Sequence, residues 1–306
     1  MRFLCLLVMF VSIVLSGILG FLTYNDSKDI EKMDSEISDY ITQQVKWQAD
    51  IDAIAPQLAE YTAQKTELET EIAALKRRAV YKTKPTAFLT FDDGTSYNTI
   101  KILDILKQYD VKATFFVVGS QIMGGSEASL TAIQRIVDEG HQLAIHAYYH
   151  EYDKIYSSVD AYFEDFEKIR TLLKNMTGYE TNIVRLPSGT ASARSFCGTY
   201  SGTTDTYYDI VSRLYEMGYT VIDWNVETKD YTTSTGVNQI IKNAVDGAEA
   251  RLSKEWKAAV VLMHDTADTV AALPSIIEGI QALGMDFETI VQGGYVTRQI
   301  AETSKP

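Results

Sequence analysis

Two adjacent carboxylates, Asp92 and Asp93, stand where an apolar run of the chain ends. The run Thr86–Phe91 has the β-prone composition of a buried strand, and Gly94 after the acids allows the backbone to turn sharply. Neighbouring carboxylates repel each other, so the pair needs either a cation or two different tasks. Successive side chains of a strand point in opposite directions, which excludes one shared role. A polar strand end in a turn is the alternative interpretation.

A pair of histidines four residues apart, His146 and His150, is the second chemical signal. The chain has only 4 histidines, so a chance pair at this spacing is rare. Histidines at this spacing can face the same way on a helical turn and bind one metal ion. With a nearby carboxylate they would form a three-ligand site that leaves positions open for water and substrate. Two surface histidines are the alternative, and His141 is predicted to be structural.

Short apolar runs alternate with helical patterns from Thr86 onward. The predicted strands are Ala87–Phe91, Ala113–Val118, Gln142–His146, Asn182–Leu186, Thr220–Val226, Ala259–Met263 and Phe287–Ile290. The predicted helices cover 98–109, 129–139, 160–176, 205–217, 237–252 and 269–283, while 119–126 and 195–205 are rich in glycine, serine and threonine and are predicted loops. About seven such repeats favour an α/β fold with a parallel sheet that closes, or nearly closes, into a barrel.

Ionisable side chains gather at the ends of five predicted strands. They are Asp92, Asp93, His146, Arg185, Asp223, Glu227, Asp230, His264 and Asp265. A βα barrel carries its active site at the carboxyl ends of its strands. The sequence therefore predicts that these groups share one catalytic face.

The N-terminal segment, residues 1–24, is predicted to be a transmembrane signal anchor. Phe3–Leu22 is an uncharged apolar run of membrane-spanning length, preceded by Arg2 and followed by Asp26. Positive charge before the run favours an N-terminus inside the cell and translocation of the rest. A cleaved signal peptide is the alternative.

Residues 25–80 are predicted to form a helical stalk. From Ile30 to Leu75 apolar positions recur at alternating steps of three and four, which is typical of a coiled coil and would allow a homodimer. Pro56 interrupts this seam, because proline removes a helical hydrogen bond. The alternatives are a kinked continuous coiled coil, a helical hairpin at Pro56, or one amphipathic helix lying on the catalytic domain, which is predicted to cover 81–306.

Composition narrows the classes of partner. The formal net charge of −13 argues against nucleic acid, whose phosphates would be repelled. Hydrophobic residues make up 46% of the 306 residues, enough for a large core. The two cysteines, Cys5 and Cys197, do not form a disulfide framework.

Five ordered motifs resemble those of the polysaccharide deacetylases of the NodB-homology type, carbohydrate esterase family 4. The motifs are Thr90–Gly94, Gly140–His150, Arg185–Gly189, Asp223–Asp230 and Leu262–Asp265. The resemblance runs from about residue 86 to about residue 290 and covers nearly the whole predicted catalytic domain. It implies a distorted (β/α)7 barrel, NodB-like and related to the TIM barrel.

The resemblance also implies a set of roles. Asp93, His146 and His150 would bind a divalent metal, zinc in the first place, with Co2+, Ni2+ or Mn2+ as alternatives. Asp92 would be the general base and His264 the general acid.

Further roles surround these residues. Arg185 would orient Asp92, and Asp230 would orient His264. The substrate-binding candidates are Tyr148, Tyr149, Pro187, Trp224 and Tyr231, and ordinary packing is the alternative for Trp224.

Four positions depart from the family pattern. Thr95 stands where proline is usual, Ala147 where serine or threonine is usual, Ser188 where an aromatic residue is common, and Glu227 where aspartate is frequent. None of these changes removes a metal ligand, the base or the acid, so we expect an active enzyme.

The expected function is that of a metal-dependent deacetylase in the cell membrane, single-pass, with its catalytic domain outside the cell. It would remove the N-acetyl group from N-acetylglucosamine or N-acetylmuramic acid in peptidoglycan and leave a free amine and acetate. Chitin oligomers or acetyl-xylan are alternative substrates. A non-enzymatic scaffold that binds envelope glycan is the alternative outside enzymes.

Overall fold

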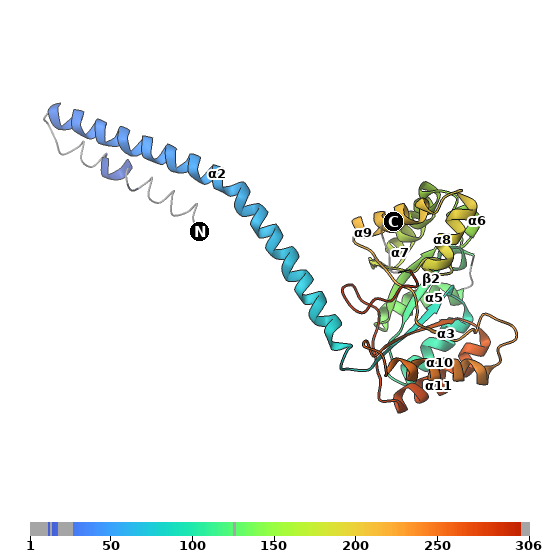
Figure 1. Cartoon of the computed structure of the whole chain (residues 1–306). Coiled ribbons are helices and arrows are strands. Elements are labelled where there is room, and N and C mark those ends of the chain that lie inside the picture. The colour runs from blue at the N-terminus through green and yellow to red at the C-terminus, as the bar shows by residue number, and fades with distance from the viewer. Residues whose placement is uncertain (1–11, 13, 18–26, 125–126, 301–306) are drawn as a thin grey trace. The chain divides into compact units, whose positions relative to one another are not determined.

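The computed structural model describes residues 12, 14–17, 27–124 and 127–300 (Figure 1). The chain divides into two compact units, residues 1–70 and 71–306. Most of the predicted anchor, Phe3–Leu22, lies outside the described residues. Within the described ranges, none of the helices combines the length and the apolar composition that a membrane crossing needs.

Helix α2 (Ser27–Val80) is one continuous helix that contains Pro56. The hairpin alternative is therefore wrong. The apolar side chains of the predicted seam are exposed along it, as for Trp47 (52% exposed) and Leu58 (61% exposed).

Among the described residues of the second unit, eight parallel strands form one sheet. They are β1 (Thr86–Asp92), β2 (Thr114–Val118), β3 (Gln142–Ala147), β4 (Ile183–Val184), β5 (Thr220–Val221), β6 (Val226–Glu227), β7 (Ala258–His264) and β8 (Asp286–Phe287). Their order is β5-β4-β3-β2-β1-β7-β6, and β8 pairs with β1. The predicted parallel α/β architecture is confirmed.

The predicted strand Thr220–Val226 is two short strands that lie at opposite ends of this order. In a flat sheet the six intervals between β5 and β6 would span roughly 29 Å at about 4.8 Å each. The five steps from Val221 to Val226 reach at most about 18 Å. The sheet must therefore curl until its two ends approach each other, which gives a distorted barrel.

The chain itself crosses the gap between these two ends. The Ile222 N–H donates to the Val184 carbonyl (3.0 Å) on one side, and the Asn225 N–H donates to the Val260 carbonyl (3.1 Å) on the other. Between them, the Asp223 N–H donates to the Thr297 carbonyl (2.8 Å) of the C-terminal segment. These backbone bonds replace the ladder that a single continuous strand would have formed.

Helices surround the curled sheet in two neighbouring groups, α3, α10 and α11 in one and α6–α9 in the other (Figure 1). Their bounds are α3 (Tyr97–Gln108), α4 (Gly119–Met123), α5 (Glu127–Asp138), α6 (Tyr152–Ile155), α7 (Val159–Thr177), α8 (Gly189–Tyr200), α9 (Asp205–Glu216), α10 (Val237–Arg251) and α11 (Ala267–Ala282). All six predicted helices are confirmed.

Two segments that were predicted as loops are partly helical, and α6 was not predicted. Helix α4 begins in the predicted loop 119–126, and α8 runs into the predicted loop 195–205. Glycine, serine and threonine give α8 a weak helix propensity. Burial of Ala193 and Cys197 in the core outweighs it.

Alternation along β1 divides the core into two parts. Ala87, Leu89 and Phe91 face the cluster between sheet and helices, whereas Phe88 belongs to a second cluster on the inner side of the curl. Full burial of such a side chain contributes about 1.5–3 kcal/mol. Asp92 continues the inner series, so packing of the strand aims this carboxylate into the barrel.

Histidine His141 has the structural role that was predicted for it. It is buried, and its Nδ1 accepts a hydrogen bond from the Ala113 N–H (3.1 Å). Burial lowers the pKa of His141 to about 4, with Lys112 adding to the effect, so the imidazole is neutral at pH 7.

Candidate active site

The two adjacent acids at the end of β1 occupy different environments. Asp92 is 3% exposed and continues the inner face of the strand. Asp93 has left the strand and adopts a positive φ of 71°. Aspartate tolerates this left-handed conformation better than most residues do. The structure thus separates the two carboxylates, as the sequence predicted.

Asp93, His146 and His150 converge with one ligand atom each, and the three atoms lie within 4.8 Å of one another. Both imidazole Nε2 atoms are 3.4 Å from Asp93 Oδ1. This oxygen is buried and has no hydrogen-bond partner anywhere in the described part of the chain. A buried carboxylate oxygen left without a donor and facing two imidazoles fits a divalent cation.

The two histidines reach this position differently from the prediction. His146 lies in strand β3, and His150 lies in the loop that follows, with a positive φ of 60°. They do not share a helical turn, so that part of the prediction is wrong. The His146 Nδ1–H donates to the Arg185 carbonyl (2.8 Å), which leaves Nε2 free as a metal ligand.

Arg185 is completely buried and holds Asp92 in place. Its Nη1 donates to Asp92 Oδ1 (2.8 Å) and to Thr90 Oγ1 (2.9 Å). Its Nη2 donates to the Asp223 carbonyl (2.9 Å), and its guanidinium lies 4.0 Å from the ring centroid of Phe116. A buried charge that donates to this many acceptors fixes the orientation of Asp92.

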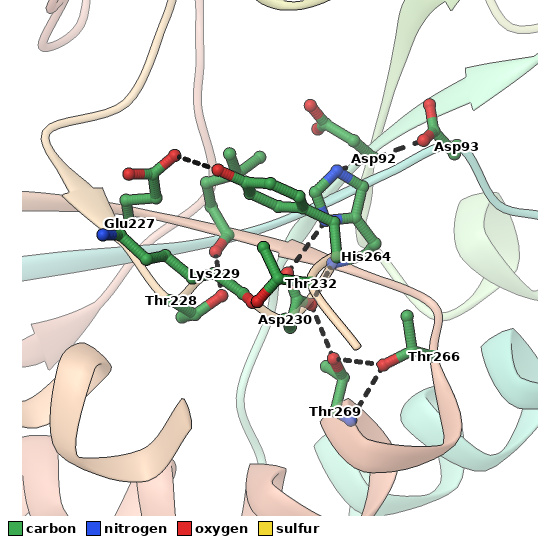
Figure 2. A network of polar contacts seen from close by, with 12 residues as sticks. Asp92, Asp93, Glu227, Thr228, Lys229, Asp230, Thr232, His264, Thr266 and Thr269 are labelled. Atoms are coloured by element: carbon green, nitrogen blue, oxygen red, sulfur yellow. Dashed lines mark hydrogen bonds and ion pairs between the residues drawn. The ribbon is translucent and has the colours of Figure 1, made fainter. Parts of the chain in front are cut away.

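His264 ends β7 directly beside Asp92, because the two residues are register partners. Its Nδ1–H donates to Asp230 Oδ1 (2.9 Å) and its backbone N–H to Asp230 Oδ2 (2.6 Å). Thr269 Oγ1 also donates to Asp230 Oδ2 (2.6 Å). Figure 2 shows Asp230 on one side of the imidazole and the two acids on the other.

These surroundings set the charge of the imidazole. Burial lowers the pKa of His264, but the hydrogen bond to Asp230 and the charges of Asp92, Asp230 and Asp93 outweigh burial and raise the pKa to about 9. Burial likewise raises the pKa of Asp230, but the hydrogen bonds from His264 and Thr269 outweigh it and lower that pKa. His264 is therefore an imidazolium at neutral pH and can donate a proton from Nε2.

A cleft of about 450 Å³ opens above these groups. Of the predicted substrate-binding residues, Trp224 and Tyr231 line it. The Trp224 ring packs on Gly189, where an added Cβ would lie 2.8 Å from the ring. Gly189 also has a positive φ of 77°. Both the close contact and the backbone conformation therefore favour glycine at this position.

The cleft has further lining residues that were not predicted to bind substrate, namely Tyr152, Ser188, Ser192, Glu227 and Gln299. Ser188 and Glu227 lie within the recognised motifs, so motif position was an available signal for them. Gln299 comes from the C-terminal segment and is held there because its N–H donates to Asp223 Oδ2 (2.7 Å). No sequence signal pointed to Gln299.

Tyr148, Tyr149 and Pro187 do not line this cleft. Both tyrosines line a separate groove of about 780 Å³ beside α7. The ring of Tyr148 packs against Gly119. Pro187 is buried, and its carbonyl accepts a hydrogen bond from the Tyr156 hydroxyl (2.9 Å). The loop that carries Tyr148 and Tyr149 therefore turns both rings toward this groove and not toward the cleft.

The chain matches known proteins over the region that carries this site. Residues 79–199 match the family model for polysaccharide deacetylase. A peptidoglycan-N-acetylglucosamine deacetylase of Bacillus cereus is 29% identical over 68% of this chain and 70% of its own length.

Two solved structures extend the comparison. The catalytic domain of a peptidoglycan N-acetylglucosamine deacetylase from Eubacterium rectale is similar with a TM-score of 0.62 and 29% identity, covering 71% of this chain and 94% of that one. The Xyl-CE4 domain of a multidomain xylanase from the hindgut metagenome of Trinervitermes trinervoides is 31% identical, with a TM-score of 0.53, over 68% of this chain and 88% of that one. The chain therefore belongs to the polysaccharide deacetylases of carbohydrate esterase family 4, which makes it a polysaccharide N-deacetylase, a hydrolase of carbon–nitrogen bonds.

Proposed function

We propose that this enzyme removes N-acetyl groups from amino sugars of cell-wall glycan, with peptidoglycan N-acetylglucosamine or N-acetylmuramic acid as the substrate. The observation that carries the proposal is the placement of Asp92 and His264 beside each other and next to the Asp93–His146–His150 cluster, inside one cleft. The similarity to peptidoglycan N-acetylglucosamine deacetylases supports this class of substrate.

Each side chain has one task in this proposal. A zinc ion held by the three ligands would polarise the acetamide carbonyl and favour ionisation of a water molecule. Arg185 occupies Asp92 Oδ1, while Asp92 Oδ2 lies 4.0 Å from His146 Nε2, on the side of the metal ligands. Asp92 Oδ2 therefore accepts the proton of the attacking water.

His264 completes the reaction at the leaving group. As the carbon–nitrogen bond breaks, its Nε2–H donates a proton to the departing nitrogen, so the products are acetate and a free amine. Asp230 stabilises the imidazolium before this transfer and holds its orientation. The arrangement is general acid–base catalysis in which Asp92 takes one proton and His264 gives another.

We expect metal-dependent acetate release from peptidoglycan. The zinc-loaded enzyme is incubated with peptidoglycan, chitin oligomers and acetyl-xylan, and acetate is measured with and without a chelator. Release should be fastest from peptidoglycan, fall to background with the chelator, and return when zinc is restored. Faster release from either other polymer would overturn the substrate assignment. Glycan binding without metal-dependent release would favour the scaffold.

We further propose that residues 1–24 anchor the enzyme in the cell membrane with the catalytic domain outside, and that α2 pairs with a second copy through its exposed seam. The apolar run Phe3–Leu22 and the three–four spacing of the seam support the two parts. The full chain should be recovered in the membrane fraction. In detergent, light scattering should give a protein mass of twice 34.3 kDa. Recovery in the soluble fraction, or the mass of one chain, would contradict the corresponding part.

A further inference from the structure

The position of His150 depends on how the backbone of the loop between His146 and His150 is held. His146 is fixed by strand β3 and by the Arg185 carbonyl. His150 follows four residues later in a left-handed conformation that most residues avoid. The side chain of Ala147, which follows His146, is only a methyl group and offers the loop no hydrogen bond. Some other group must therefore hold this loop.

Asp165 of helix α7 holds this loop through two hydrogen bonds from the loop backbone. Its Oδ2 accepts a hydrogen bond from the Tyr148 N–H (2.7 Å), and its Oδ1 accepts one from the Tyr149 N–H (2.9 Å). The Tyr148 carbonyl is tied as well, because it accepts from the Ser120 N–H (2.8 Å). Three successive backbone groups of the loop are thus fixed immediately before His150.

Burial of the Asp165 carboxylate costs free energy. Asp165 is 7% exposed, and burial disfavours a charged group. Burial raises the pKa of Asp165, and the two amides oppose that shift because they bond to the charged form. Only a carboxylate brings two acceptor oxygens to two neighbouring N–H donors. An asparagine would turn its own NH2 group toward one of them.

We infer that Asp165 is a positioning residue for the metal site, which holds the Tyr148–Tyr149 backbone so that His150 Nε2 faces Asp93 and His146. The inference rests on the metal site of the proposed function. It assigns to α7 the task of organising a ligand that α7 does not itself contain. Groups that orient metal ligands typically change metal affinity by about 10–100-fold when they are removed.

The test is the zinc affinity of Asp165→Asn, measured by competition with a chromophoric chelator. Asp160→Asn is the matched control, because it makes the same chemical change on the same helix at an exposed residue. We expect Asp165→Asn to bind zinc about 10–100-fold more weakly than the unaltered enzyme. Asp160→Asn should bind zinc normally. Saturating zinc should restore most of the acetate release of Asp165→Asn, because the base and the acid are intact.

Two results would overturn the inference. One is normal zinc affinity in Asp165→Asn, and the other is a loss of acetate release that saturating zinc does not reduce. If Asp165→Asn does not fold, Asp165→Ser is measured instead, since its single hydroxyl on a shorter side chain cannot replace both carboxylate oxygens, and unchanged zinc affinity in that variant would equally overturn the inference. Zinc binding needs no substrate. Normal zinc binding by the unaltered enzyme without acetate release from any glycan would therefore contradict the proposed function and leave this inference standing.

Discussion

Replacing Asp92 by asparagine is expected to lower the rate of acetate release by about 10²–10⁴-fold, the range for loss of a general acid or base. The amide keeps the shape of the side chain and can still accept from Arg185 through its oxygen. It cannot take a proton from the attacking water at neutral pH. Measurement of kcat on peptidoglycan at saturating zinc isolates this loss from any change in metal content.

The control for this variant is Asp104→Asn, the same change at a carboxylate on α3 whose partner is Arg135 on the outside of the barrel. Asp104→Asn should release acetate at the normal rate. A kcat for Asp92→Asn within about threefold of the unaltered enzyme would contradict the role of Asp92 as base, because loss of a general base costs far more.

Replacing Arg185 by methionine is expected to lower the free energy of unfolding by about 3–5 kcal/mol, the usual cost of breaking a buried ion pair from one side. Arg185 is 0% exposed, and its partner Asp92 is 3% exposed, so the remaining carboxylate would be buried without its cation. The Thr90 hydroxyl and the Asp223 carbonyl would lose their donor as well. Urea unfolding measures this change.

A double variant separates the charge from the packing in this result. When Asp92→Asn is added to Arg185→Met, the unpaired charge disappears, and part of the lost stability should return. We expect the two effects to deviate from additivity by about 0.5–3 kcal/mol, the range for coupled neighbours. Strict additivity, or a loss below about 1 kcal/mol for Arg185→Met alone, would contradict the central structural role of this pair.

The parts of the site that the sequence predicted are those fixed by local position. Asp92, His146 and His264 are recognisable because each is a polar residue at the end of an apolar strand, and parallel strands bring such ends together. That Asp92 and Asp93 differ in role followed from strand alternation, whereas the assignment of Asp92 as base and Asp93 as metal ligand came from the family resemblance. The structure separates the two carboxylates, because Asp93 leaves the strand with a left-handed backbone.

The parts that the sequence did not predict depend on tertiary contacts. The strand predicted at Thr220–Val226 has uniform β-propensity, and only closure of the curl divides it between the two ends of the sheet. Tyr148 and Tyr149 look like sugar-binding aromatics in the motif. The backbone bonds that they donate to Asp165, and the one that Tyr148 accepts from Ser120, fix a loop that turns them toward another groove. Gln299 reaches the cleft from far along the chain.

Helix α2 is a case in which a single residue and the overall pattern of the sequence predicted different structures. Pro56 suggested a possible break, because it lacks the N–H of the helical ladder. The heptad pattern on both sides of Pro56 keeps one register, and the helix continues through it. A pattern spread over many residues was here a better guide than a single residue of low helix propensity.

The proposed mechanism depends most on Asp93 as a metal ligand and Asp92 as the base. Bound zinc per chain, measured side by side in Asp92→Asn and Asp93→Asn after dialysis against the same free zinc concentration, tests this assignment directly. We predict that Asp92→Asn retains one zinc ion per chain while it loses acetate release, and that Asp93→Asn loses zinc. Loss of zinc from Asp92→Asn, or full retention of zinc by Asp93→Asn, would contradict the account.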